Sequence, residues 1–552
     1  MVRGKRARRI LVLLPLLSGC GSAPAPPPAA PQESPFLQKV RQVHARVPET
    51  LAKNHKTFAV PDGVIEGFGA GEAYPQIWLR DSSWIVDAAS ADYPKEALIS
   101  WLDLHLARAA GNGRLRDWVA GGTAAAFREW APRVEEKGGI AWDTNSNESD
   151  QEPSASLAWC RIERLLGGKA EDTPARDARI TRLVKAMDAL GRDRTDPKTG
   201  LIWSGLTADW GDVSPVHPDQ RAIYLDEKTP RTLSLYSNVM AFAALDCLAS
   251  LEGPTVRREA LSARAAKLKD RIRSGFWMKD RGFFRIRIDL DLVPPGFADD
   301  ADRFALGGNA LAALFGVADD AEAGSIFDAA ERLRTANRFS TISTTLIPPY
   351  PGGVFQHPAM REPYRYQNGG QWDWFGAALV QAEFERGRSE SARAHLDQIA
   401  TRVLAAGPGL HAWYGQEGSP QGSPAYAASA AAIHNAIVKG LLGVTRSAEG
   451  YRITVRAGET LLPFELKSRA AATVLTLRQT VGPSAIEVQV EGASPLREIC
   501  SLVPKNRMPA DSSALDAAQP RSIRRIGADT LMCADMTSGA SAARVRFALA
   551  PR

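Results

Sequence analysis

The chain has little cysteine and few aromatic residues. Its 552 residues include 5 Cys, and Phe, Trp and Tyr together make up 7% of them. Five cysteines are too few for a fold held together mainly by disulfides. The other proportions, 44% hydrophobic and 24% charged, are those of an ordinary globular protein, which excludes a wholly disordered or collagen-like chain.

Beyond its first nine residues, the chain also has almost no excess of basic over acidic residues. The formal net charge is +6, and five of these charges come from Arg3, Lys5, Arg6, Arg8 and Arg9. The rest of the chain therefore carries about +1, without a basic stripe that would neutralise phosphates. We expect no nucleic-acid partner.

The N-terminus accounts for that charge. The basic start is followed by an apolar run at 10–17, too short to cross a bilayer, and then by Leu-Ser-Gly-Cys. This layout resembles a bacterial lipoprotein signal over residues 1–19, with Cys20 as the lipidated residue and Gly21 favouring the outer membrane. An ordinary signal peptide with an incidental Cys is the alternative. Residues 20–35 are rich in Pro and read as a tether that holds the body off the membrane, on its periplasmic or outer face.

Helical spacing of apolar residues dominates from 36 to 445. About a dozen helices separated by Gly- and Pro-rich loops suit six helical hairpins closed into a ring. The sequence therefore predicts a mainly α protein with an (α/α)6 toroid. Cys160 and Cys247 fall within these helical patterns and are expected to be small buried residues.

From 446 to 552 the apolar residues alternate, which predicts a small β-sandwich-like accessory domain. It either supports the ring or binds glycan independently, and the first role is preferred. Cys500 and Cys533 lie in this region, and an exported location permits but does not require a disulfide between them.

Five polar and aromatic clusters interrupt the helical part, at 74–84, 142–156, 207–215 with 229–231, 364–374 and 411–432. Loops with such compositions are where binding and catalytic sites are built. Each cluster also has a purely structural interpretation. Arg80 and Asp81 alone are a common ion pair at a helix start, and Asp150 or Ser154 caps a helix.

Taken in order, the clusters resemble those of the six-hairpin (α/α)6 glycosidases of glucoamylase and amylo-α-1,6-glucosidase type. The resemblance implies that a W-x-R-D segment grips the terminal sugar, that a W-x-D segment ahead of T-P-R carries the general acid, and that a Y-x-N-G-x-x-W segment shapes the pocket. The matching residues here are Trp78, Arg80 and Asp81; Trp210, Asp212 and Arg231; and Tyr366, Asn368 and Trp372. We add Asp150, Gln151, Gln371 and Trp413 from the same clusters as substrate-binding residues.

Inverting hydrolysis, which predominates in this superfamily, needs one carboxyl that protonates the leaving oxygen and another that activates water. Asp212 is the predicted acid, because neighbouring tryptophans would shield it from water, and Asp209 is its rival. Relatives carry the base directly before an aromatic pair, where this chain has Ala412. Glu417 is the predicted base, and Glu72, Glu152 and Asp373 are alternatives.

No metal or cofactor is expected, because the eight histidines follow no ligand spacing and no phosphate-binding or dinucleotide-binding glycine motif is present. The predicted function is that of an exported, lipid-anchored glycoside hydrolase. We expect it to be exo-acting and inverting on oligosaccharides, polysaccharides or α-glucan-like glycans. The alternative is a catalytically silent glycan-binding lipoprotein. A lyase or epimerase is disfavoured, because those rely on Tyr and His rather than on carboxylates. The oligomeric state is open.

Overall fold

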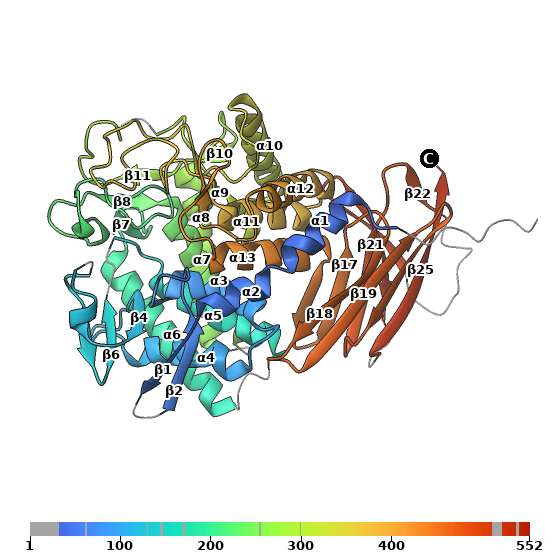
Figure 1. The fold of residues 1–552 in the computed structure, drawn as a ribbon, viewed down its shortest axis with the longest axis horizontal. Coiled ribbons are helices and arrows are strands. Elements are labelled where there is room, and N and C mark those ends of the chain that lie inside the picture. Colours follow the sequence, from blue (N-terminus) through green and yellow to red (C-terminus); the bar gives the residue numbers. More distant parts are fainter. Residues whose placement is uncertain are drawn as a thin grey trace, which may run out of the picture. The chain divides into compact units, whose positions relative to one another are not determined.

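The computed structural model describes residues 32–60, 63–129, 131–143, 147–168, 173–252, 255–297, 300–510, 521–536 and 540–551 (Figure 1). The predicted signal, Cys20 and most of the tether lie outside these ranges. Glu33–Arg552 forms one compact unit. Glu33, within the predicted tether, is buried and accepts two hydrogen bonds from Arg41. The boundary placed at residue 445 marks a change of secondary structure within this unit.

Six helices form an inner ring in which each contacts the next and the last contacts the first. They are α3 (Leu79–Ala89), α5 (Gln151–Leu165), α7 (Leu235–Leu251), α9 (Leu306–Leu314), α11 (Asp373–Glu385) and α13 (Ala427–Asn435). Helices such as α7 and α11 are buried almost all round, as their apolar sequences require.

A second set of helices packs against the inner ring. These are α2 (Val47–Asn54), α4 (Lys95–Ala107), α6 (Thr173–Arg194), α8 (Val256–Phe276), α10 (Asp320–Ala336) and α12 (Ser389–Ala405), with α1 (Pro35–His44) on α12. Their sequences are one-sided: α8 buries Leu261, Ala265, Leu268, Ile272 and Phe276 and exposes its charged residues. Shorter helical turns are η1 (Ala124–Ala126), η2 (Gln220–Ile223) and η3 (Ala436–Leu441).

Short strands between these helices build small sheets that the sequence did not predict. Four of these sheets have two strands: β1 (His55–Val60) with β2 (Gly63–Phe68), β9 (Trp277–Met278) with β10 (Phe283–Phe284), β12 (Phe304–Ala305) with β13 (Leu346–Ile347), and β14 (Trp413–Tyr414) with β15 (Pro420–Gln421). A three-stranded sheet contains β7 (Trp203–Gly205), β8 (Arg231–Ser234) and β11 (Arg287–Asp289). A four-stranded sheet contains, in order, β3 (Ile77–Trp78), β4 (Trp118–Gly121), β6 (Ile140–Asp143) and β5 (Glu135–Lys137). Several of them precede an inner helix and fix where it starts.

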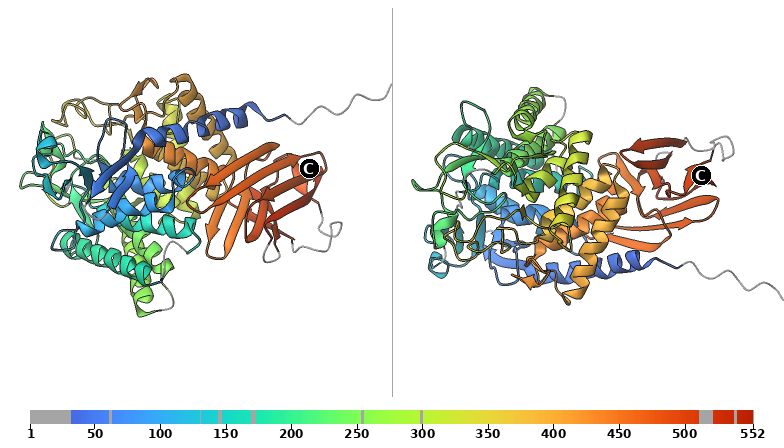
Figure 2. Two further views of the ribbon diagram at one scale, coloured as in Figure 1. Left: turned by 60° about the horizontal axis from the view of Figure 1, so that its bottom comes forward. Right: turned by 90° about the horizontal axis from the view of Figure 1, so that it is seen from above.

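The C-terminal strands form two five-stranded sheets. The first sheet contains, in order, β16 (Val444–Ser447), β17 (Gly450–Val455), β21 (Leu496–Leu502), β24 (Asp529–Asp535) and β23 (Arg521–Ile526). The second sheet contains, in order, β18 (Leu461–Ser468), β19 (Thr473–Val481), β20 (Ala485–Glu491), β25 (Ala542–Pro551) and β22 (Arg507–Pro509). Ile453 and Ile499 of the first sheet share one hydrophobic cluster with Leu477 and Val488 of the second. All three views in Figures 1 and 2 show these strands together on one side of the helices.

Two expectations need correction. The chain is not mainly α, because strands make up 25% against 40% helix. Cys160 and Cys247 are buried as expected, but they form a disulfide between α5 and α7. A second disulfide joins Cys500 and Cys533, which are directly opposite on β21 and β24.

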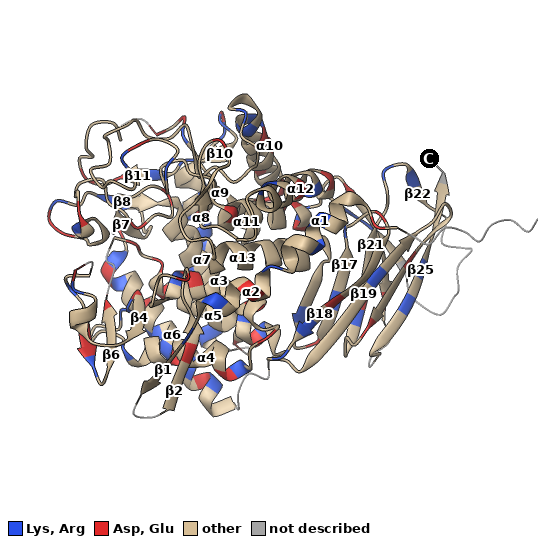
Figure 3. Cartoon of the chain, viewed as in Figure 1, with Lys and Arg blue, Asp and Glu red and all other residues tan. Residues whose placement is uncertain are grey.

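Among the described residues, every helix is too short or too polar to pass through a bilayer. Figure 3 shows basic and acidic residues interspersed over helices and strands.

Candidate active site

One cavity of about 540 Å³ opens where the inner helices begin. Asp81 stands in the first turn of α3, Trp372 directly precedes α11, and Tyr426 directly precedes α13. The cavity brings together eight of the predicted site residues: Trp78, Arg80, Asp81, Trp210, Asp212, Tyr366, Trp372 and Trp413. Segments far apart in the sequence therefore meet at one site.

Arg80 and Asp81 are both buried at the cavity wall. The Arg80 Nε donates to Asp150 Oδ2 at 2.8 Å, and the Tyr426 hydroxyl donates to Asp81 Oδ1 at 2.9 Å. Burial raises the pKa of Asp81 to about 6, against the opposing effects of Arg80 and Tyr426. Near neutral pH this carboxylate can accept hydrogen bonds from a sugar hydroxyl.

Two further acids, Asp117 and Glu148, are buried behind Arg80. Asp117 lies 4.0 Å from the Arg80 guanidinium and Glu148 accepts from Thr207 at 3.3 Å. Burial raises the pKa of each carboxyl well above its usual range, and the charge of Asp150 adds to that rise. Sequence reasoning did not identify Asp117, and Glu148 was one acid among several in its cluster.

Asp212 lines the cavity from the middle of the loop between β7 and η2. The Gln367 side-chain amide donates to Asp212 Oδ1 at 3.2 Å. Its rival Asp209 points elsewhere: with φ 54°, it accepts from the amides of Gly307 and Gly308 in the first turn of α9. Asp209 therefore anchors the loop to a helix N-terminus, and Asp212 faces the cavity.

Aromatic rings form much of the rest of the wall. The Trp210 and Trp372 ring centroids are 4.9 Å apart, and those of Trp372 and Tyr426 are 5.6 Å apart. Trp372 is fixed by its Nε1, which donates to the Tyr366 carbonyl at 2.9 Å. Such preorganised faces suit the C–H faces of a pyranose ring.

Four predicted binding residues lie behind the wall rather than in it. Asp150 accepts from Arg80 and from the Tyr236 hydroxyl, and Gln151 next to it is fully buried at the start of α5. Asn368 binds the backbone of Tyr350 and Met360. Gln371 donates to the carbonyls of Gly415 and Gln416. These residues shape the site without lining it.

Two other predicted site residues lie outside the cavity. Arg231 is exposed and its guanidinium and backbone amide bind Asp291, away from the cavity. Glu417 is exposed and lines a neighbouring hollow, so it does not share the cavity of Asp212. Ala412 lines the cavity itself, so a methyl group stands at the position where the resemblance implied a base.

The alternative bases also lie elsewhere. Glu72 is exposed on the loop before Tyr74, Glu152 binds Arg114 at 2.7 Å, and Asp373 binds Arg402 and Ser343. Among the described residues that line the cavity, Asp81 and Asp212 are the two carboxylates.

Several lining residues were missed by the sequence reasoning, namely Tyr74, Gln76, Gln220, His357, Gln367, Ser423 and Tyr426. Gln367 and Tyr426 fell inside recognised clusters, and their position beside motif residues was an available signal. Gln220 begins η2 and His357 lies in a long loop, and neither belongs to a motif, so only the fold reveals them.

Within the described ranges, one group of possible metal ligands was found, Glu498 with Cys500 and Cys533. Those cysteines are joined in a disulfide, so their sulfurs are not thiolates, the form that binds metals. The group lies in the C-terminal sheets, outside the cavity.

No protein-family model matches the chain, and no curated protein matches it by sequence. Solved structures do resemble it. A GH63 mannosylglycerate hydrolase from Thermus thermophilus, in complex with glucose, aligns over 71% of this chain and 100% of its own, at 16% identity and TM-score 0.50. A Streptomyces avermitilis α-L-rhamnosidase, complexed with L-rhamnose, aligns over 94% of this chain and 42% of its own, at 11% identity and TM-score 0.54.

A GH78 rhamnosidase of Bacillus sp. GL1 aligns over 86% of this chain and 42% of its own, at 14% identity and TM-score 0.50. The chain therefore shares its fold with these glycosidases, as the resemblance drawn from the loops predicted. At these identities the likeness defines the fold, and the reaction has to be argued from the residues of the cavity.

Proposed function

We propose that this protein is an exported, lipid-anchored glycoside hydrolase that removes a terminal sugar from oligosaccharides on an (α/α)6 toroid, with Asp212 as general acid. One observation carries the proposal: Asp212, the Arg80–Asp81 pair and four tryptophans line a single cavity of about 540 Å³. This volume fits one or two sugar rings, and the aromatic wall and carboxylates are the groups that bind and cleave them.

Asp81 is the second carboxyl of the proposed site. It replaces the predicted base Glu417, which lies in another hollow. Asp81 hydrogen-bonds substrate hydroxyls and, as the remaining carboxylate in the cavity, is the candidate to activate water. Inversion at the anomeric carbon is expected from the superfamily and is checked by proton NMR of the first product formed.

Export and anchoring rest on the sequence of residues 1–35. Palmitate labelling of the full chain tests them, and Cys20→Ala should abolish both the label and membrane association. A labelled Cys20→Ala protein would contradict the assignment.

A second function is favoured by Ala412. A methyl group at the wall where relatives carry the base suits a barrel that binds glycan without cleaving it. In that case wild-type protein binds sugars and releases no product, while Ala412→Glu gains turnover.

The deciding experiment compares wild type, Asp212→Asn and Ala412→Glu on a panel of glucose, mannose and rhamnose oligosaccharides. For the hydrolase, Asp212→Asn should lower kcat by about 10²–10⁴-fold at unchanged folding, because proton transfer to the leaving oxygen is lost. Arg361→Ala, an exposed residue outside the cavity, is the matched control. Unaltered turnover in Asp212→Asn would eliminate Asp212 as the acid.

A further inference from the structure

We infer that a depression on the C-terminal sheets docks onto anionic phospholipid headgroups and so turns the mouth of the sugar cavity away from the membrane. The inference rests on the proposed lipid anchor and goes beyond it, because a tether by itself sets a distance and not an orientation. The depression measures about 690 Å³ and lies between the start of α12 and strands β22 and β23, each of which is the outermost strand at one edge of its sheet.

Positive charge is concentrated in this depression, where five cations stand against two acids. The cations are Arg388, Arg393, Lys505, Arg507 and Arg525, and the acids are Glu390 and Asp529. Three of the cations are held in ion pairs: Arg388 with Asp328, Arg393 with Glu459, and Lys505 with Glu390. Within the described ranges, Arg507 and Arg525 have no acidic partner. Their charge is therefore left for an anionic ligand.

Apolar side chains are exposed at the same place. Met508 of β22 and Ile523 of β23 line the depression and are 47% and 55% exposed, and Ile526 at the end of β23 is 37% exposed. These are three of the eight large hydrophobic residues that are exposed among the described residues. Arginines beside exposed apolar side chains suit a membrane interface, because the guanidinium groups attract anionic headgroups while the apolar groups enter the acyl boundary.

The floor of the depression is fixed to the helical ring. The Asp529 carboxylate accepts hydrogen bonds from the backbone amide and the hydroxyl of Ser389, the first residue of α12. One residue earlier, the Ala528 amide donates to the Gly387 carbonyl at 2.9 Å. These bonds join the turn between β23 and β24 to the connection between α11 and α12.

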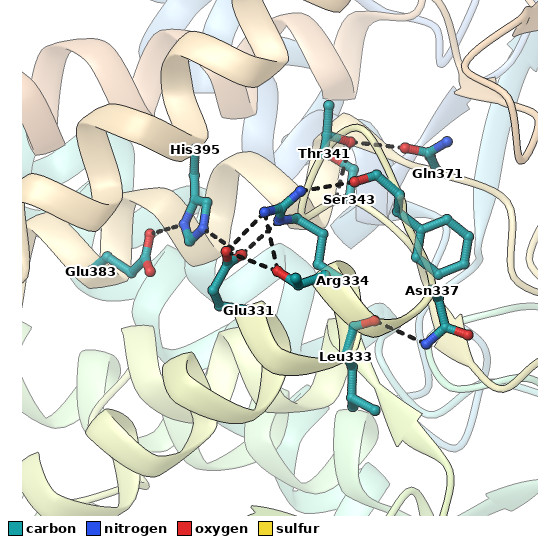
Figure 4. Close-up of polar contacts among 11 residues, drawn as sticks. Glu331, Leu333, Arg334, Asn337, Thr341, Ser343, Gln371, Glu383 and His395 are labelled. Atoms are coloured by element: carbon teal, nitrogen blue, oxygen red, sulfur yellow. Dashed lines mark hydrogen bonds and ion pairs between the residues drawn. The ribbon is translucent and has the colours of Figure 1, made fainter.

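Helix α12 is in turn braced by its neighbours (Figure 4). The two ring nitrogens of His395 lie 2.8 Å from Glu383 of α11 and 3.1 Å from Glu331 of α10. Burial opposes the charged imidazolium, but the two carboxylates outweigh it and raise the pKa of His395 to about 9. The brace therefore persists at neutral pH, and the side chains of the depression stand on a rigid base, which lowers the entropy cost of binding.

The chain enters the folded unit beside this depression. Glu33, the first residue of the unit, accepts a hydrogen bond from the Leu462 amide at 3.0 Å, and α1 then packs on α12 (Figure 1). The guanidinium of Arg393, which lines the depression, lies 5.2 Å from the ring centroid of Phe36. Twelve residues separate Cys20 from Glu33, and a chain of that length spans at most about 45 Å. A lipid on Cys20 would therefore keep this side of the molecule within reach of the membrane.

The mouth of the cavity lies at the other end of the inner helices. Trp372 lines the cavity and directly precedes α11, whereas Arg388 lines the depression and follows the end of α11. The 13 residues of α11 separate the two by about 20 Å along the helix axis. Docking through the depression therefore leaves the mouth open to glycans in solution.

The test uses the chain from residue 21 onward, which contains the whole folded unit, cannot carry the lipid and has a net charge of about +1. Its binding to phosphatidylcholine vesicles, with and without phosphatidylglycerol, is measured by co-sedimentation. Binding should require phosphatidylglycerol. It should fall about fivefold in Arg507→Gln or Arg525→Gln and about 25-fold in the double variant, the usual contribution of basic residues at an anionic surface. Arg182→Gln with Arg258→Gln, exposed on α6 and α8, is the matched control and should bind like the wild type.

A measurement on the wild type alone adds an independent arm. At about 1 M salt the Debye length falls to about 3 Å, so the protein should leave the vesicles. Equal binding to both kinds of vesicle, no binding, or an equal loss in the control pair would overturn the docking surface. None of these results depends on turnover or on lipid attachment. A palmitate label on Cys20 without vesicle binding would leave the anchor standing and refute the docking alone.

A fluorophore on a single thiol tests the orientation. In the chain from residue 21 the four remaining cysteines are joined in disulfides, so Asn506→Cys and Glu72→Cys each supply one free thiol. Asn506 is exposed between Lys505 and Arg507 at the depression, and Glu72 is exposed on the loop before Tyr74 at the mouth. Nitroxide-labelled lipid should quench the fluorophore at position 506 and spare the one at position 72. Any other pattern would contradict the orientation.

Discussion

The two ends of the inner ring differ in the charged side chains that gather there. Where the inner helices begin, five acids are buried, Asp81, Glu148, Asp150, Asp209 and Asp373, together with the cations Arg80 and Arg402. Where they end, a second cavity of about 350 Å³ lies under strands β16 to β19 and is lined by Arg161, Arg164 and Lys439, with Asp87 and Glu385 beside them. Helix N-termini stabilise negative charge and C-termini positive charge, so six helices running the same way produce this polarity.

This contrast indicates which end is functional. At the mouth, Asp81 and Asp212 face an open cavity, and two more acids behind Arg80 have raised pKa values. At the closed end the cations are used within the fold: Lys439 binds Asp87 at 2.5 Å and Arg164 donates to Cys247 Sγ. Charged side chains therefore face a ligand-sized cavity at the mouth, whereas at the other end they are paired with groups of the protein itself. Four sets of variants probe this contrast.

The largest effect is expected from Asp87→Asn at the closed end. It leaves the half-buried Lys439 and Arg161 beside a neutral side chain, which should lower the free energy of unfolding by about 3–5 kcal/mol. Urea denaturation followed by circular dichroism measures the change, with exposed Asp280→Asn as control. A loss below about 1 kcal/mol would mean that the helix ends alone balance these cations.

The next effect concerns the disulfide between α5 and α7. Replacing Cys160 and Cys247 by Ser opens a loop of 87 residues and should cost about 2–4 kcal/mol in unfolding free energy. The same change at Cys500 and Cys533, separated by 33 residues, should cost about 1 kcal/mol less. Thermal unfolding of the two double variants checks the order, and the reverse order contradicts the loop-length argument.

At the mouth, sugar affinity should depend on pH through Asp81. Its pKa of about 6 means that acidification below pH 6 protonates the carboxylate and removes a hydrogen-bond acceptor. Affinity should fall by about tenfold for each pH unit below this value, since only the ionised fraction binds. Titration of the sugar at pH 5 to 8 measures it, and Asp81→Asn should give weak, pH-independent binding. A wild-type profile that is flat from pH 5 to 8 would exclude Asp81 from sugar binding.

The smallest effect is expected for Arg231→Ala. Arg231 pairs with Asp291 at the surface, and exposed pairs contribute about 0–1 kcal/mol to stability. Both the unfolding free energy and kcat/KM should therefore stay near wild type. A large fall in kcat/KM would restore the role that the T-P-R motif predicted for this residue.

Much of the site follows from local sequence. Trp78, Arg80, Asp81, Trp210, Asp212 and Trp372 were identified from motifs and meet in one cavity, and several of these motifs directly precede or open an inner helix. Gln371 and Asn368 belong to the same motifs, but their side chains point away from the cavity. A motif fixes spacing along the chain, whereas the direction of each side chain depends on turns such as the strained one at Tyr364.

Glu417 lies outside the cavity for a related reason. It lies three residues beyond Tyr414, where β14 has ended and the hairpin turns outward, so it reaches the neighbouring hollow. The partner of Cys160 was equally hidden: helical spacing predicted two buried cysteines, but only the contact between α5 and α7 shows that they meet.

Local patterns were enough to specify the helical hairpins, the change to strands near residue 445 and the residue types at the mouth, because periodicity and motifs are properties of neighbouring residues. Three-dimensional packing settled which carboxylates face the cavity, which cysteines pair and which buried acids gather where the inner helices begin. Those outcomes depend on closing the ring, which brings helix ends separated by hundreds of residues to the same place.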